Sequence, residues 1–460
     1  MTTQRIRPSR TRVVSRRAIA GFVMAWAGTS AGVEPIAALP DDGGATFRNP
    51  RRVGEGGVPH GIPRQVAQAA TVSTCADAGT GSLRAAVAAN AALIDMTSLG
   101  CSTISLTTGE LVADVGVTDL TLNGPLDHVL TIDANHLGAI LVHEGGGTLT
   151  LDHVKLTNGA GTNFTAFVGG CIYSLGSVTL QNSTISNCIL NAQDATRGGA
   201  VYAHVDLTLN DSVLSGNVAQ STSGAALGGA AFVGGKLLMN RSTIRDNTAL
   251  SNSAVASGGG AYVRGEARLY AATVSGNQSA YEGGLAVLSK TTIYNSTISG
   301  NYASLLVGGV YAKGLLSLDN STVAFNAHAS TQSGAGVYAT LGVIAHSSIA
   351  ANNTCTTSAQ HCDIECKGCS ISGSNNLIMA ANVALPPGTI VVDPMLAALA
   401  SNGGPAKTHA PLPGSPVLDK GSNIRDFLFD QRGHPRSFGL GPDIGAFESE
   451  SDLIFVDGFD

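Results

Sequence analysis

A short phrase of apolar and polar residues recurs along most of the chain at nearly constant spacing. Its fullest form is Leu-Gln-Asn-Ser-Thr-Ile at residues 180–185, and successive copies begin 24 to 30 residues apart. The first residue of each copy is apolar, at Leu122, Leu151, Leu180, Leu209, Met239, Leu269, Ile293, Leu318 and Ile344. Such regularity is typical of a repeat protein whose units stack on one another.

Each phrase predicts two short strands. Apolar residues spaced by two, with polar residues between them, are typical of a strand that buries one face. The first strand would bury a further residue two positions before the phrase, at Leu120, Leu149, Val178, Leu207, Leu237, Ala267, Thr291, Leu316 and Gly342. The second strand would follow a polar bend and bury the residue five positions after the phrase begins, at Ile185, Leu214, Ile244, Val274, Ile298, Val323 and Ile349.

A third strand is predicted after a pair of small residues. The pairs are Gly169–Gly170, Gly198–Gly199, Gly228–Gly229, Gly258–Gly259, Gly283–Gly284, Gly308–Gly309 and Ala335–Gly336. We therefore predict an all-β fold, a right-handed parallel β-helix with three short strands per coil. Its coils would stack about 4.8 Å apart. A short helix at 81–87 would cap the first coil.

A column of asparagines supports this register. It lies three residues past the second inward position, with Cys188 in the same slot one coil earlier, and comprises Asn217, Asn247, Asn277, Asn301, Asn326 and Asn352. Asparagine tolerates left-handed backbone and can pass hydrogen bonds from coil to coil, so we expect a structural ladder at a turn.

The chain divides into five segments. Residues 1–31 hold six arginines, no acid and a short apolar run from Ala18 to Ala27, the layout of a signal peptide. Ser15-Arg16-Arg17 leaves twin-arginine and general secretory export both open. A flexible linker (32–69), the β-helix (70–399), a closing segment (400–448) and a C-terminal tail (449–460) would follow.

Charge and composition narrow the possible partners. The formal net charge is −6, and it becomes −12 once the six arginines of residues 1–31 are removed. Nucleic acid and anionic lipid are therefore poor candidates, because phosphate binding requires Lys and Arg. No stretch of 18 apolar residues follows the signal, so no membrane-spanning helix is expected.

The eight cysteines fit an oxidising destination. Cys75 and Cys101 flank the first predicted coil and are expected to pair. A cluster of four has spacing that allows two disulfides or a zinc site, with disulfides favoured by export, and comprises Cys355, Cys362, Cys366 and Cys369. Cys171 and Cys188 could pair or stay as buried thiols.

The repeats resemble those of polymorphic outer-membrane proteins and, more widely, the right-handed β-helix proteins of bacteria. The resemblance lies in the glycine pairs and in phrases such as Asn-Ser-Thr-Ile-Ser-Gly-Asn at 295–301. Residues 75–87, with Ser82-Leu83-Arg84, resemble the leader of exported β-helix proteins. The stretches at 402–405, 414–419, 430–433 and 443–448 resemble the choice-of-anchor Q domain. The resemblance implies an extracellular, cell-surface or outer-membrane-associated protein without an agreed activity.

The β-helix fold also occurs in pectate lyases and polygalacturonases, so an enzyme has to be considered. Such a lyase requires outward carboxylates close enough to hold calcium, with an Arg or Lys as base. The outward column after the phrase start holds two acids, Asp152 and Asp319, which are six coils apart. We therefore expect no catalytic residue, no metal site and no cofactor.

Two polar sets keep alternatives open. Asp152, His153 and Lys155 form either a solvated face or an acid/base site. The charged residues of the closing segment form either ion pairs and turn caps or a site for calcium or another ligand, and they comprise Asp419, Asp430, Arg432, His434, Arg436, Asp443 and Glu448.

The strongest functional hypothesis from the sequence is a ladder of aromatic residues. They follow the small-residue pairs, and alternation would turn them outward. They are Tyr173, Tyr202, Phe232, Tyr262, Tyr311 and Tyr338. Rings so stacked could offer flat faces to a cell-surface glycan, or could form a purely structural column. We thus expect a non-catalytic adhesion, envelope or glycan-binding protein, with a polysaccharide lyase or glycoside hydrolase as the alternative.

Overall fold

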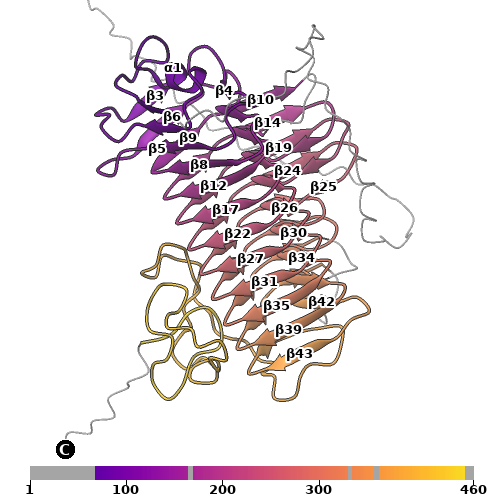
Figure 1. The fold of residues 1–460 in the computed structure, drawn as a ribbon. Coiled ribbons are helices and arrows are strands. Elements are labelled where there is room, and N and C mark those ends of the chain that lie inside the picture. The colour runs from indigo at the N-terminus through magenta and orange to yellow at the C-terminus, as the bar shows by residue number, and fades with distance from the viewer. Residues whose placement is uncertain (1–67, 164–168, 330–333, 357–361, 451–460) are drawn as a thin grey trace, which may run out of the picture. The chain divides into compact units, whose positions relative to one another are not determined.

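The computed structural model describes residues 68–163, 169–329, 334–356 and 362–450. The predicted signal peptide, almost all of the linker and most of the C-terminal tail lie outside these ranges. Within them the chain forms an all-β parallel solenoid, in which each strand pairs with the equivalent strand of the next coil (Figure 1). The described strands form five sheets, which we call A to E.

Sheet A contains the first strand of each phrase, in twelve strands: β1 (Ala69–Thr71), β2 (Leu93–Asp95), β5 (Leu120–Asn123), β8 (Thr148–Asp152), β12 (Ser177–Gln181), β17 (Leu207–Asn210), β22 (Leu237–Asn240), β27 (Ala267–Tyr270), β31 (Thr291–Tyr294), β35 (Leu315–Asp319), β39 (Gly342–His346) and β43 (Ile371–Ser374). Sheet B contains the second strand, in eleven strands: β3 (Thr103–Ser105), β6 (Leu130–Asp133), β9 (Val154–Thr157), β13 (Thr184–Ser186), β18 (Val213–Ser215), β23 (Thr243–Arg245), β28 (Thr273–Ser275), β32 (Thr297–Ser299), β36 (Thr322–Ala324), β40 (Ile349–Ala351) and β44 (Leu377–Ile378).

Sheet C contains the strand after the small-residue pair, in ten strands: β4 (Leu111–Ala113), β7 (Leu141–His143), β11 (Ile172–Ser174), β16 (Val201–Ala203), β21 (Ala231–Val233), β26 (Ala261–Val263), β30 (Leu285–Val287), β34 (Val310–Ala312), β38 (Val337–Ala339) and β42 (Ile364–Cys366).

Two further sheets were not expected. Sheet D follows sheet B in eight strands: β10 (Ala160–Asn163), β14 (Ile189–Ala192), β19 (Val218–Ser221), β24 (Thr248–Ser251), β29 (Gln278–Ser279), β33 (Tyr302–Ala303), β37 (Ala327–His328) and β41 (Thr354–Cys355). Sheet E is short: β15 (Thr196–Arg197), β20 (Ala226–Leu227) and β25 (Ala256–Ser257). A coil in the middle of the solenoid therefore has four or five short strands, not three, because the connection from sheet B to sheet C also pairs with its neighbours.

A short helix, α1 (Leu83–Ala88), lies at the N-terminal end of the described solenoid. The Ser82 hydroxyl accepts a hydrogen bond from the Ala85 amide at 3.2 Å, which caps the first turn. Leu83, Ala86 and Val87 are buried in the same core as the first coils. The predicted helix thus covers apolar residues that an open first coil would expose.

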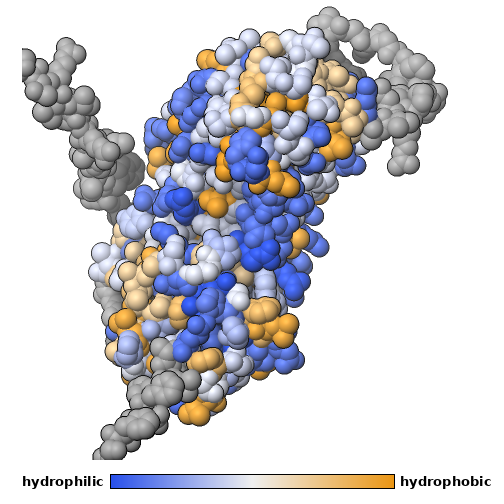
Figure 2. Space-filling view, turned by 90° about the vertical axis from the view of Figure 1, so that its left-hand side faces the viewer, coloured by the Kyte–Doolittle hydropathy of each residue, from blue (hydrophilic) through white to orange (hydrophobic). Residues whose placement is uncertain are grey.

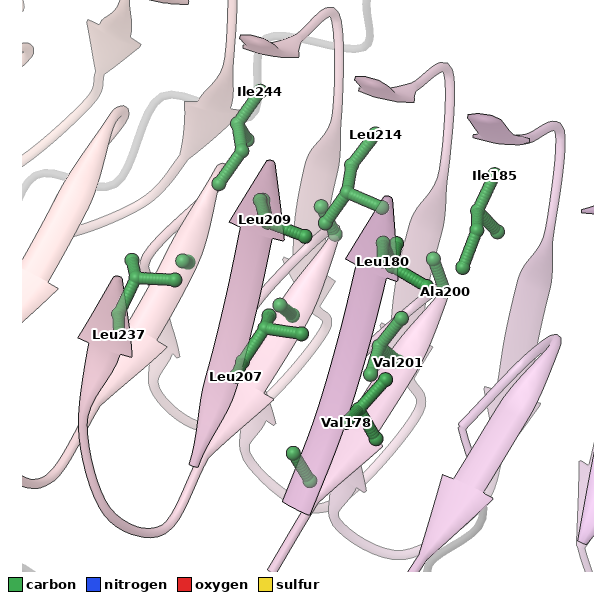
Figure 3. Close-up of a cluster of buried hydrophobic side chains, with 14 of the residues drawn as sticks. Val178, Leu180, Ile185, Ala200, Val201, Leu207, Leu209, Leu214, Leu237 and Ile244 are labelled. Carbon is green, nitrogen blue, oxygen red and sulfur yellow. The ribbon is translucent and has the colours of Figure 1, made fainter. Parts of the chain in front are cut away.

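The interior consists of columns of like residues. Leu122, Leu151, Leu180, Leu209, Met239, Leu269, Ile293 and Leu318 pair in unbroken register, and each is at most 1 % exposed. Figure 3 shows how Leu180 and Leu209 of sheet A, Ile185 and Leu214 of sheet B and Val201 of sheet C point into one shared core. The alternation of apolar and polar positions therefore predicted which side chains are buried.

The last predicted members of these columns are wrong by one residue. Leu318 pairs with Ala345, whereas Ile344 pairs with Ser317 and faces away from the core. Val323 likewise pairs with Ala350 and not with Ile349. A shift of one position exchanges the two faces of a strand. The pattern was ambiguous here because the outward Ile349 is also buried, against Val417 and Ile444 of the closing segment.

The asparagine column forms a buried ladder of hydrogen bonds. In each step the Nδ2 group donates to the Oδ1 atom of the next asparagine at 2.9 Å and to a backbone carbonyl of a preceding coil at 3.0–3.3 Å. The last asparagine is Asn353, not the predicted Asn352, in keeping with the same shift. Asn353 in turn donates to Asp363 at 2.8 Å. At the other end Asn217 accepts from the Cys188 amide at 3.0 Å.

The glycine pairs are required by close approach between coils. A Cβ atom on Gly199 would lie 2.0 Å from the carbonyl oxygen of Gly229, and one on Gly229 would lie 2.1 Å from that of Gly259. Any larger residue in this column would therefore push the coils apart, which explains why the pair recurs in the sequence.

Four disulfides link neighbouring parts of the chain. They join Cys75 to Cys101, Cys171 to Cys188, Cys355 to Cys362 and Cys366 to Cys369. The four-cysteine cluster is thus paired as disulfides in the structure, and Cys171 and Cys188, which the sequence left open, also pair.

The closing segment packs against the outer face of sheet B (Figure 1, yellow). The Gln431 side chain inserts between coils, where its Oε1 accepts from Thr297 at 2.6 Å and its Nε2 donates to Thr273 at 2.8 Å. Asn295 donates to the carbonyl of Phe429, and the Ala446 amide donates to Thr322. These contacts lie along sheet B from β28 to β40.

We predict that Asn277→Ala lowers the free energy of unfolding by about 3 kcal/mol, because it removes four buried hydrogen bonds to Asn247, Ile244 and Asn301. Denaturant titration measures this change. The control is Asn240→Ala on the exposed face of sheet A, which loses a bond to Asn210 and should cost less than about 1 kcal/mol. Equal losses for the two variants would contradict a stabilising ladder.

Candidate functional site

The predicted aromatic ladder exists, but it is buried. Its rings stack in two runs, with centroids 5.1–5.7 Å apart from Tyr173 to Tyr262 and 5.8 Å apart from Tyr311 to Tyr338. Ala286 fills the slot between the runs. Tyr173 is half-buried, and the other five rings are at most 7 % exposed. The expectation that these rings face solvent is therefore wrong, and their burial supports the alternative of a structural column.

The cover over this ladder comes from the connections between sheets D and C. Leu227 of β20 packs against the first run of rings together with Val255, while Leu306 and Val307 pack against the second. These residues lie on segments of variable length that the repeat pattern did not describe. The rings do turn away from the solenoid core, as alternation predicted, but they enter a second apolar layer instead of solvent.

A carboxyl group is buried in the same outer layer. Glu282 is 3 % exposed, and its carboxylate accepts a hydrogen bond from the Ser257 hydroxyl. Burial raises the pKa of Glu282 to about 7, although hydrogen bonds from Ser257 and the Gly258 amide partly oppose this rise. The hydrogen bond between Ser257 and Glu282 joins two neighbouring coils. Glu282 lies in this covered layer and lines none of the hollows described below.

The charged residues of the closing segment form ion pairs and turn caps. Arg432 pairs with Asp430 at 2.8 Å, and the Asp430 carboxylate accepts the amides of Arg432, His434 and Glu448. Asp443 caps the amides of Asp419 and Ser449, and Asp419 caps those of Leu440 and Gly441. Their carboxylates are thus engaged in holding an irregular segment in shape.

Arg436 is a buried cation among these charges. It is 1 % exposed, donates to the carbonyls of Asp443 and Gly445 at 2.8 and 2.7 Å, and lies 3.8 Å from the Glu448 carboxylate. Burial lowers the pKa of Arg436. The carboxylate of Glu448 also accepts the amides of Phe438 and Asp443, so this pair organises the closing segment from within.

Two hollows follow sheet B on the outside of the solenoid and share the residues Arg245 and Asp246. One has a volume of about 600 Å³ and is lined by Val129, Lys155, Thr184, Ser186, Asn187, Ser215, Gly216, Arg245 and Asp246. The other, of about 550 Å³, is lined by Arg245, Asp246, Ser275, Gly276, Ser299, Gly300, Phe325, Leu396, Ala398, Leu399, Lys407 and His409. We call these two adjoining hollows together the sheet B groove.

The groove follows a column of turns with left-handed backbone. The turn residue after each sheet B strand from β9 to β40 has a φ of 56–66°, as at Asn187, Gly216, Asp246, Gly276 and Gly300. Glycine at three of these positions leaves space where other coils have a side chain. The repeated Ser-Gly-Asn at 215–217, 275–277 and 299–301 is the sequence signal that could have indicated this groove.

The polar groups of the groove are arranged for hydrogen bonding. Arg245 pairs with Asp246 at 2.7 Å, and both side chains are about half exposed. His409 is held between Ser299 and the carbonyl of Ala397, at 2.8 and 2.7 Å, so its Nδ1–H donates to the carbonyl and its Nε2 accepts from the hydroxyl. Burial lowers the pKa of His409, which favours this neutral form.

Of the polar set predicted at 152–155, only Lys155 lines the groove. Asp152 and His153 pair with each other at 2.6 Å at the bend between sheets A and B. Figure 2 views the molecule from the side on which the closing segment lies in Figure 1, and hydrophilic residues gather across the middle of this face. Lys407 and His409, which the sequence did not single out, reach the groove from the closing segment.

Neither a metal centre nor a membrane span is found in the described parts of the chain. Among those residues, no three His, Cys, Asp or Glu side chains come close enough to hold an ion. None of the described segments forms a helix of the length and hydrophobicity needed to cross a bilayer. No model of a known protein family matches this chain, and neither does any curated protein sequence.

We predict that Glu282→Gln changes how stability depends on pH. Between about pH 4.5 and 7 the folded protein keeps a proton on Glu282 that the unfolded chain has lost, so the wild type loses stability as pH rises through this window. A glutamine side chain does not titrate, so the variant does not lose stability from this group as the pH rises. Its free energy of unfolding relative to wild type should therefore increase by up to about 3 kcal/mol from pH 4.5 to 7.5. Parallel pH profiles of the two proteins, measured by denaturant titration, would refute the assignment.

Proposed function

We propose that this protein is an exported, non-catalytic right-handed β-helix, displayed at the cell surface or released outside the cell, that binds an extended glycan along the sheet B groove. The observation that carries the proposal is that two hollows adjoin along sheet B. They meet at Arg245 and Asp246, and their lining residues come from β9, β13, β18, β23, β28 and β32. A chain-like ligand fits a depression that crosses this many coils.

The chemistry of the lining supports a sugar ligand. Serine and threonine hydroxyls and the Arg245–Asp246 pair offer donors and acceptors to sugar hydroxyls, while Phe325 and Leu396 offer apolar surface to ring C–H groups. Asp246 is already paired with Arg245, and both ring nitrogens of His409 are engaged. These residues are held in place for binding, and a proton-transfer role would require them to exchange partners.

Export and family membership form part of the same proposal. The four disulfides are compatible with an oxidising compartment outside the cytoplasm. The repeat phrases and the closing stretches support a relationship to the polymorphic outer-membrane protein repeats and the choice-of-anchor Q domain. Right-handed winding is favoured because connections between parallel neighbouring strands are right-handed in nearly all proteins.

The test is a glycan array probed with the purified mature protein, followed by titration calorimetry on the best ligand. We predict that Lys155→Ala with Arg245→Ala weakens binding at least about tenfold, because hydrogen bonds to charged groups contribute about 1.5–3 kcal/mol each. Folding should be unaffected, since the Arg245–Asp246 pair is exposed.

The matched control is Lys313→Ala with Lys367→Ala, which removes the same charge from two exposed lysines outside the groove. The control should bind like the wild type. Equal binding by all three proteins would reject the groove as the site. Release of unsaturated or shortened sugars from the bound glycan would instead establish the lyase or hydrolase alternative.

A further inference from the structure

A second hollow lies on the outer face of sheet A, separate from the sheet B groove. It has a volume of about 330 Å³ and is formed by β22, β27 and β31 with the residues just before them. Its charged and aromatic side chains are those of Lys236, Glu266, Arg268, Lys290 and Tyr294. We call it the sheet A cleft. None of its lining residues is shared with the sheet B groove.

Strand register brings three cations together in this cleft. Leu237, Ala267 and Thr291 pair across the three strands, so Lys236, Glu266 and Lys290, each one position earlier, follow one another along the sheet edge. Arg268 is two positions after Glu266 on the middle strand, on the same face. Neighbouring strands are about 4.8 Å apart, which places all three cations within reach of one sugar unit and its substituents.

These cations are exposed and lack ion-pair partners. Lys236, Arg268 and Lys290 are all exposed, and in the part of the chain that the structure describes no carboxylate forms a salt bridge with them. By contrast, Arg241, which directly follows β22, pairs with Asp211. Glu266 is the only acid among the residues that line the cleft. The cleft therefore has a local positive charge, although the net charge of the chain is −6.

An aromatic wall orients the central arginine. The Arg268 guanidinium lies 5.7 Å from the Tyr294 ring, and that ring also contacts Phe427 of the closing segment at 5.7 Å. Arg425 approaches the same ring at 5.3 Å while it pairs with Asp319 at 3.1 Å. The wall is thus built from two distant parts of the chain, and it limits the positions that Arg268 can adopt.

We propose that the sheet A cleft binds an anionic sugar unit, one with a carboxylate or sulfate group, of an acidic polysaccharide. The planar fork of Arg268 matches two oxygens of such a group, and Lys290 and Lys236 supply further charge. Glu266 accepts hydrogen bonds from sugar hydroxyls, and the exposed Leu238 faces the ring carbons. This site and its ligand class are independent of the glycan proposed for the sheet B groove.

The experiment compares three forms of one polymer by titration calorimetry on the full mature protein: unmodified dextran, carboxymethyl-dextran and dextran sulfate of equal length. We expect the two anionic forms to bind at least ten times more tightly than unmodified dextran, with affinity that falls as salt is added. Arg268→Gln with Lys290→Gln should weaken their binding at least tenfold. Glu266→Gln, which removes the acid of the cleft, should strengthen it two- to threefold.

The Lys155→Ala with Arg245→Ala variant of the sheet B groove should bind the anionic dextrans like the wild type, which separates the two sites. Thermal unfolding checks that each variant folds, and Glu266→Gln tests the cleft by a gain of affinity if the double variant does not fold. Equal binding of neutral and anionic dextrans, or unchanged affinity in the Arg268 and Lys290 variant, would overturn the proposal. So would binding to phosphatidylglycerol vesicles or inorganic phosphate without binding to either anionic dextran.

Discussion

Parallel stacking of successive coils at one strand spacing is the constraint on which the rest of this structure depends. Backbone amides and carbonyls of a strand pair with the coils before and after it, so equivalent residues must lie directly above one another. Side chains in the interior then have to match in size, as they do from Leu122 to Leu318. The same constraint allows no Cβ at Gly199 or Gly229.

The turns satisfy this constraint with ladders of their own. Where the chain leaves sheet B, backbone groups would be buried without partners, and the asparagine column supplies them from Asn217 to Asn353. A parallel column of serines does the same after sheet A, where the amides of Ser183 and Ser212 donate to the hydroxyl of the next serine at 3.2 and 3.0 Å. These buried polar ladders, together with the apolar core, specify the register.

Function is then a matter of which outer faces stay open. The connections between sheets D and C cover the aromatic column, and the closing segment packs against sheet B from β28 to β40. Two open surfaces beside the closing segment are the sheet B groove and the sheet A cleft. Lys407 and His409 of that segment line the groove, and Phe427 contacts the ring of Tyr294 at the cleft. The cations also differ in exposure between these regions. The side chains of Arg432 and Arg436 are buried and engaged within the closing segment. Those of Lys236, Arg268 and Lys290 face solvent.

The sequence alone determined the coil and its register. Stacked coils require similar residues at equivalent positions, so the same pattern recurs in every repeat. It located the inward residues, the glycine pairs and the asparagine ladder without any partner element in view. It failed by one position at Ile344 and Ile349, and at Ile349 the closing segment buries the outer face and removes the contrast between the two sides of the strand. It also left undecided whether the ring of Tyr262 meets solvent or Leu227, and it did not indicate that Arg268 and Phe427 share the ring of Tyr294. Those contacts join segments that do not repeat, and only the tertiary structure decides them, because nothing in the spacing of one coil specifies what packs against its outside.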